Sequence, residues 1–138
     1  MLRIHMSWCV AVALALSAAC GHAPSPEAGR VVRTVEISDQ VNPQILYAAP
    51  GDEVRWMNAR ANAVRVGFLD LRLIENHQCQ SGIVNFFGQV NDLITIAPGE
   101  SISLCFNRTG DLRYNVWFDA EDPRGAISPT FTISVRGG

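Results

Sequence analysis

The chain contains no lysine, and all 11 of its basic residues are arginine. They are scattered among 13 acidic residues, and the formal net charge is −2. Proteins that bind nucleic acid need a basic patch or stripe that neutralises the phosphates, and this sequence contains no such run. We therefore expect no nucleic-acid partner.

Long hydrophobic runs are also scarce. The apolar stretch Trp8–Leu16 follows a short polar start with Arg3 and His5, and small residues come after it. It is much shorter than the roughly 18 residues of a membrane-spanning helix, and no other stretch is longer. This arrangement is typical of an export signal, so residues 1–19 are predicted to be a signal peptide.

The cysteine at position 20 indicates the type of signal. The stretch LSAAC resembles the bacterial lipobox, in which the cysteine is acylated and becomes the mature N-terminus, although Leu16 lies one place further from Cys20 than in the commonest version. The alternative is an ordinary signal peptide with a chance cysteine. Two or more acyl chains, palmitate among them, hold a protein stably on a membrane. Cys20 is therefore predicted to carry a lasting lipid anchor.

The remaining chain divides into a tether and one domain. Residues 20–30 are rich in Gly, Pro and Ala, which is typical of a flexible linker behind an acylated N-terminus. Residues 31–138 are long enough for one compact core. Gly21, rather than aspartate, follows the cysteine and favours delivery to the outer membrane. We expect a lipid-anchored protein of the bacterial cell envelope that faces the periplasm.

Only two cysteines, Cys79 and Cys105, belong to the predicted domain. In an oxidising compartment such a pair is most often a disulfide. Closing this loop would contribute about 3.5 kcal/mol of stability. The alternative is a metal site in which His77 joins the two cysteines, although these ligands are few for a closed site.

Alternating apolar residues predict strands with one buried face. The predicted strands are VVRTVEI (31–37), QILYA (44–48), DEVRWMN (52–58), AVRVGF (63–68), LITI (93–96), SISLCFN (101–107), LRYNVWF (112–118) and TFTISVR (130–136). Many short strands separated by turns indicate an all-β fold, a two-sheet Greek-key β-sandwich.

The connections between these strands carry further signals. Pro-Gly occurs in Ala48–Asp52 and again in Ala97–Glu100, where it predicts type II turns with a positive φ at glycine. Tyr114, near a strand start, is predicted to form a tyrosine corner that bonds back to the preceding turn. Residues 70–92 are too long for a hairpin and are expected to wrap over a sheet.

Two longer motifs resemble those of the cupredoxin family (plastocyanin and azurin type). The stretch NPQILYAAPGDEVRWMN resembles its leading proline, Pro-Gly-Asp turn and Val-x-Trp-x-Asn strand, and IAPGESISLCFNRTGDLRYNVWF resembles its later Pro-Gly-Glu turn and tyrosine strand. The resemblance covers nearly all of residues 31–135. It implies a cupredoxin-like fold.

Copper cupredoxins bind the metal through two histidines, a cysteine and usually a methionine. The resemblance puts these four ligands, in chain order, at Val64, at Phe118, near Glu121 and near Ile127. None of these side chains supplies the borderline or soft donor that copper requires. The domain also has a single histidine, His77. The resemblance therefore implies a domain without a copper cofactor.

The sequence favours a binding or structural role over catalysis. One histidine, no nucleophile elbow and no persuasive carboxylate pair argue against an enzyme. We expect a module that meets the membrane through its lipid anchor and an envelope protein through its surface, with Phe86 and Phe87 as the candidate partner surface. The alternative is a copper-binding or electron-transfer protein with an atypical site around His77, Cys79 and Cys105.

Overall fold

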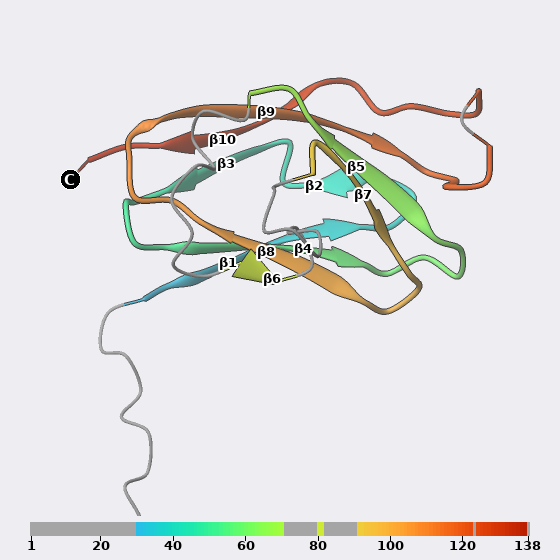
Figure 1. Ribbon diagram of the computed structural model, residues 1–138, viewed down its shortest axis with the longest axis horizontal. Helices are drawn as coiled ribbons and strands as arrows, with labels where there is room; N and C mark the ends of the chain where they lie inside the picture. The colour runs from blue at the N-terminus through green and yellow to red at the C-terminus, as the bar shows by residue number, and fades with distance from the viewer. Residues whose placement is uncertain (1–29, 71–79, 82–90, 123, 138) are drawn as a thin grey trace, which may run out of the picture.

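Two five-stranded sheets, packed face to face, form the domain (Figure 1). The computed structural model describes residues 30–70, 80–81, 91–122 and 124–137. Its strands are β1 (Val32–Ile37), β2 (Val41–Asn42), β3 (Ile45–Ala48), β4 (Glu53–Asn58), β5 (Val64–Phe68), β6 (Gln80–Ser81), β7 (Leu93–Ile96), β8 (Ser101–Cys105), β9 (Gly110–Trp117) and β10 (Phe131–Val135).

The first sheet has the order β2-β1-β4-β8-β6, and the second has the order β3-β10-β9-β5-β7. β1 runs parallel to β4, and β3 runs parallel to β10, whereas the other pairs are antiparallel. Within the described part of the chain, we find no helix with the length and hydropathy that crossing a membrane requires. The predicted all-β Greek-key sandwich is confirmed.

All eight predicted strands are present, with ends that differ by one or two residues. The sequence analysis missed β2 and β6, each of which has two residues. A strand of two residues is too short to show a repeating pattern, and its pairing depends on the neighbouring strand. Both lie at the edges of the first sheet, where they extend β1 and β8.

Aromatic rings join the two sheets at the centre of the core. Trp56 of β4 makes edge-to-face contacts with Phe68 and Tyr114 of the other sheet, at centroid distances of 5.2 and 5.7 Å. Tyr114 in turn lies 5.7 Å from Phe131. Each such pair contributes about 0.5–1.5 kcal/mol beyond the area it buries. The rings therefore hold strands from both sheets in one arrangement.

The predicted tyrosine corner is wrong. Tyr114 lies in the middle of β9, fully buried, and its hydroxyl has no hydrogen-bond partner among the described residues. The indole N–H of Trp56 is also unpaired among them. Burial raises the pKa of Tyr114 far above its ordinary value, because the apolar surroundings disfavour the phenolate. Tyr114 therefore contributes to the core through its ring.

Both predicted Pro-Gly turns are confirmed. Gly51 has φ +96° and Gly99 has φ +74°, values that L-residues with a side chain rarely adopt. Each turn closes with a backbone hydrogen bond, from Asp52 to Ala49 at 3.0 Å and from Glu100 to Ala97 at 3.1 Å. The two turns lie at opposite ends of the sandwich, before β4 and before β8.

Two serines that alternate with the apolar residues of their strands are nevertheless buried. Ser103 and Ser134 are on the outward side of their strands but only 7% and 4% exposed. Each hydroxyl donates to a carboxylate, Ser103 to Glu53 at 2.8 Å and Ser134 to Asp111 at 2.7 Å. The two acids belong to neighbouring strands. The pattern along a single strand therefore could not predict that these serines are buried.

Candidate functional site

The four positions that the resemblance assigns to copper ligands lie at the start of β5 and in the connection that follows β9. Val64 begins β5 and is fully buried in the hydrophobic core. Phe118 follows β9 and packs partly buried against that core. Glu121 is exposed, and Ile127 is 50% exposed and bridges to Trp117.

The residues at these positions do not fit a type 1 copper ion. Val64, Phe118 and Ile127 have no lone pair to donate, and the exposed carboxylate of Glu121 is a hard donor. Among the described residues, no three or more His, Cys, Asp or Glu side chains gather into a group that could hold a metal. The donor chemistry of these positions therefore departs from that of a copper centre.

An arginine lies between the β1–β2 bend and the segment that follows β9. Arg60, in the loop between β4 and β5, donates from Nη1 to the carbonyl of Ser38 at 2.9 Å and from Nε to the side chain of Asn62 at 3.3 Å. Its guanidinium carbon lies 5.4 Å from the centre of the Phe118 ring. Arg60 thus links the β1–β2 bend, its own loop and the segment after β9.

Asn58 organises the base of the same loop. It is fully buried at the end of β4, and its side-chain amide donates to the carbonyls of Asn62 and Ile96, at 2.9 and 3.0 Å. Its side-chain oxygen accepts the backbone N–H of Arg60 at 2.9 Å. A buried side chain bonded in this way fixes the path of the chain between the two sheets.

Asn62 connects this loop to the β9–β10 connection. Its side chain donates to the carbonyl of Phe118 at 2.8 Å. The backbone N–H of Ala120 donates to the carbonyl of Ala63 at 2.9 Å. The structure therefore brings the loop before Val64 and the segment of Phe118 into direct contact.

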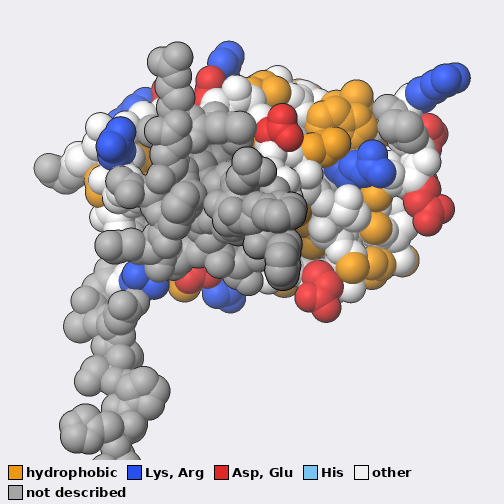
Figure 2. Space-filling view, in the orientation of Figure 1, with side chains coloured by type: hydrophobic (Ala, Val, Ile, Leu, Met, Phe, Trp, Pro, Cys, Tyr) orange, Lys and Arg blue, Asp and Glu red, His pale blue; other side chains and the backbone are white. Residues whose placement is uncertain are grey.

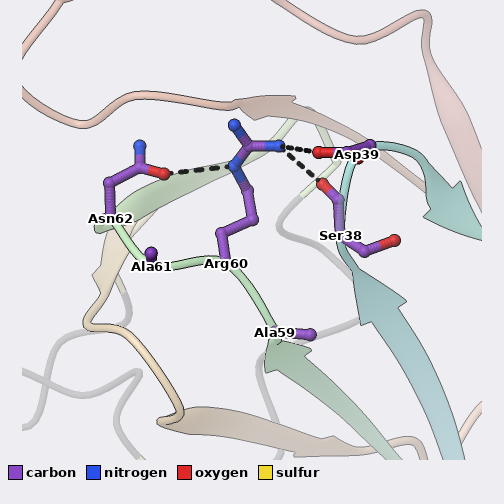
Figure 3. A pocket seen from close by; sticks show the side chains of 6 residues that line it. All are labelled: Ser38, Asp39, Ala59, Arg60, Ala61 and Asn62. Atoms are coloured by element: carbon purple, nitrogen blue, oxygen red, sulfur yellow. Dashed lines mark hydrogen bonds and ion pairs between the residues drawn. The ribbon is translucent and has the colours of Figure 1, made fainter.

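A shallow hollow of about 360 Å³ lies beside the Arg60 side chain (Figure 3). We call it the Arg60 hollow. It is lined by Ser38, Asp39, Ala59, Arg60, Ala61 and Asn62. The Arg60 side chain is 25% exposed. The hollow therefore presents a partly buried positive charge to solvent.

The acidic partner of Arg60 does not neutralise this charge inside the protein. Nη1 of Arg60 lies 3.2 Å from Asp39, whose side chain is fully exposed. Ion pairs of this kind contribute little because water and salt screen them. Figure 2 shows acidic and basic side chains interspersed over the described part of the visible face, with no broad patch of one sign.

Most of the predicted site residues lie outside the described residues. These are Cys20, His77, Cys79, Phe86 and Phe87. Cys105 ends β8, is half-buried and is disulfide-bonded. The pairing of Cys79 with Cys105 stays a prediction, as do the lipid anchor at Cys20 and the partner surface at Phe86 and Phe87.

The sequence analysis missed Arg60, Asn58 and Asn62 as a group. The local signal was the stretch NARANA, which begins with the Asn of the Val-x-Trp-x-Asn strand and continues into a short loop with Arg and a second Asn. Asn commonly bonds nearby backbone in turns, so the stretch indicates a structured loop. It does not indicate that Phe118 or Ser38 would lie beside Arg60.

Comparisons with known proteins support the fold. No family model and no curated protein matches the sequence. Among solved structures, the reduced form of a Trp-to-Tyr variant of amicyanin superposes with a TM-score of 0.51 at 17% identity, covering 80% of this chain and 87% of amicyanin. The Cu(I) form of a Met-to-Ala amicyanin variant gives a TM-score of 0.51 at 18% identity, with the same coverage. The domain is a cupredoxin-like β-sandwich.

Proposed function

We propose that the protein is a lipid-anchored binding module of the bacterial cell envelope, in which a cupredoxin-like domain works without a type 1 copper ion. The observation that carries this proposal is the set of residues at the four ligand positions, Val64, Phe118, Glu121 and Ile127. Their side chains cannot replace two imidazoles, a thiolate and a thioether.

The surroundings of these positions support the same proposal. The guanidinium of Arg60 lies over the ring of Phe118, so a fixed positive charge stands beside the position that would hold the thiolate. A cation placed nearby would be repelled by this charge. The space next to Val64 is filled by the hydrophobic core, in which that residue is fully buried.

The topology supports a presenting role for a lipid-anchored domain. The described chain begins at Arg30, next to the start of β1, while Ser38 and Asp39 of the Arg60 hollow follow the end of β1. Six residues of extended strand span roughly 20 Å. An anchor at Cys20 would therefore join the domain, through residues 20–30, at the end of the sandwich opposite the hollow.

Copper reconstitution tests the absence of a type 1 site. We expect the purified, unreduced domain to bind no stoichiometric copper, as measured by elemental analysis after desalting, and to show no reactive thiol. Stoichiometric, tightly held copper with an intense visible colour would overturn the proposal. A matched positive control is the triple variant Val64→His, Phe118→Cys and Glu121→His, in which a thiolate-to-copper absorption band is the expected gain.

The anchor is tested separately from the metal. We expect the full-length protein, expressed in a bacterium that processes lipoproteins, to incorporate labelled palmitate and partition into the detergent phase. The Cys20→Ser variant should lose both properties and keep the thermal unfolding profile of its domain. Palmitate incorporation that persists in Cys20→Ser would contradict the assignment of this cysteine.

A further inference from the structure

We propose that the Arg60 hollow is a binding site for a carboxylate group. The inference rests on the proposed binding role and deepens it by naming the chemistry of the group that is bound. A free small carboxylate and an acidic group of a partner protein share this chemistry, and the experiment below distinguishes them.

The guanidinium of Arg60 is held in place through two of its nitrogens, which leaves the third for a ligand. Nε and Nη1 are engaged by Asn62, Ser38 and Asp39, whereas Nη2 has no hydrogen-bond partner among the described residues. Figure 3 shows this third nitrogen directed away from the bonded pair. A guanidinium that is already oriented loses little conformational freedom when it binds an anion.

Two backbone amides of the same loop are further candidate donors in the hollow. Ala61 and Asn62 both line the hollow, and neither backbone N–H donates a hydrogen bond to any described residue. Successive free backbone N–H groups in a loop favour anion binding, because their dipoles add to a nearby positive charge. The hollow therefore combines one charged donor group with two neutral donors.

The ring of Phe118 strengthens the case for an anion at Nη2. The guanidinium carbon of Arg60 lies over this ring, 5.4 Å from its centre. The Arg60 side chain is 25% exposed, so water reaches only part of it. Partial loss of water makes a charge-assisted hydrogen bond to a carboxylate stronger than it would be on an open surface.

Asp39 favours a ligand with a single negative charge over one with two. Its carboxylate lines the hollow and already contacts Nη1 at 3.2 Å. A dianion such as sulfate would be repelled by this acid more than a monoanion would. A carboxylate can also take the place of Asp39, because that side chain is fully exposed and free to turn away.

Titration with sodium acetate, followed by ¹⁵N-resolved NMR, tests the site on the soluble domain that begins at residue 21. The side-chain NεH signal of Arg60 and the amide signals of Ala61 and Asn62 should shift in a saturable way. Sodium chloride at matched ionic strength should produce no saturable shift. Sodium sulfate should bind more weakly than acetate.

Two variants move the expected affinity in opposite directions. Arg60→Met should weaken acetate binding about tenfold or more, because the charged donor is lost. Asp39→Asn should strengthen it about threefold, because a competing carboxylate is removed from an exposed position. Asp39→Asn keeps the proposal testable even if Arg60→Met fails to fold.

Peptides distinguish the two sources of the carboxylate. A short peptide with a free C-terminal carboxylate is compared with the same peptide amidated and with acetate. Tighter binding of the free-carboxylate peptide than of acetate indicates a partner protein, whereas equal binding indicates a small molecule. No saturable shift with acetate or peptide, or shifts unchanged by Arg60→Met, would overturn the proposal. The anchor and copper experiments do not depend on this result.

Discussion

The two ends of the sandwich are closed in different ways. At the end where the described chain begins, one turn and one buried acid connect the strands, through Pro50-Gly51 and the contact between Arg33 and Asp52. At the opposite end, Asn58, Asn62 and Arg60 form a network that reaches several separate segments. Both ends contain contacts between distant segments. At the first end these are backbone hydrogen bonds, such as the one from Gly51 to the carbonyl of Phe106 at 2.7 Å, and the Arg33–Asp52 pair, whereas at the second end they are made mainly by side-chain amides and a guanidinium.

The difference follows from what each end must connect. Asp52 accepts the backbone N–H of Ala49, three residues earlier, and the Nε of Arg33 on the neighbouring β1. Asn58 and Asn62 instead reach carbonyls as far away in sequence as Ile96 and Phe118. The long-range polar contacts of this end connect its loops, and they leave Nη2 of Arg60 without a partner among the described residues.

The largest expected effect is at Asn58. Asn58→Ala removes three hydrogen bonds and leaves buried carbonyl groups without partners, so it should lower the free energy of unfolding by about 3 kcal/mol. Urea titration measures the loss. The matched control Asn62→Ala removes a half-buried side chain and should cost about 1 kcal/mol. Equal losses would show that the network does not centre on Asn58.

At the other end, Asp52→Asn should cost about 1.5 kcal/mol at pH 7. Burial by itself would raise the pKa of Asp52, but the N–H of Ala49 and the guanidinium of Arg33 together hold that pKa below its ordinary value. The ionised form is therefore stabilised by folding. Asp39→Asn, which removes an exposed acid at the opposite end, should leave the stability unchanged within error.

The contribution of Asp52 also has a pH dependence with a definite sign. Its pKa is lower in the folded protein, so its stabilisation is present above the unfolded value and is lost as the pH falls through the folded value. The stability difference between wild type and Asp52→Asn should shrink below about pH 4. A difference that stays constant from pH 7 to pH 2 would contradict this role.

The two Pro-Gly turns allow the stability of the two ends to be compared, because each turn has a glycine with a positive φ. Gly51→Ala and Gly99→Ala both place a side chain at a positive φ, and neither new Cβ meets an atom within 4 Å. Each substitution should therefore cost about 1 kcal/mol from backbone strain alone, measured by thermal unfolding. A markedly smaller cost at Gly99 would indicate that the polar end relaxes around its turn.

The smallest expected effect lies between the ends, at the core. Tyr114→Phe removes a buried hydroxyl that has no partner among the described residues, so stability should stay within about 0.5 kcal/mol of wild type or rise slightly. Tyr114→Ala is the contrasting variant, and loss of the ring should cost about 3 kcal/mol or more. A large loss in Tyr114→Phe would reveal a hydrogen bond to the hydroxyl.

The sequence predicted the strands well because their pattern is local. Alternation identified Ile102, Leu104 and Phe106 as one buried face, and all three are at most 3% exposed. It failed for Ser103, which a carboxylate of β4 covers. The tyrosine corner failed because the place of Tyr114 depends on where β9 begins, and pairing with β10 extends β9 back to Gly110.

The candidate site was less accessible to sequence reasoning. The residue types at Val64, Phe118, Glu121 and Ile127 argue against copper by themselves, since donor chemistry belongs to the side chain. The residue type of Arg60 does not predict a functional role, because an arginine in a polar loop is normally solvated. Its role depends on Phe118, which lies far along the chain but only 5.4 Å away in space.

The sequence by itself determined the two-residue period, the positive-φ glycines and the residue types at the four positions that the resemblance assigns to copper ligands, because each of these is a property of single residues and their nearest neighbours. The tertiary structure alone decided which loops meet at the Arg60 hollow and which polar side chains are buried. Those outcomes depend on contacts between segments far apart in the chain, and strand pairing across two sheets brings these segments together.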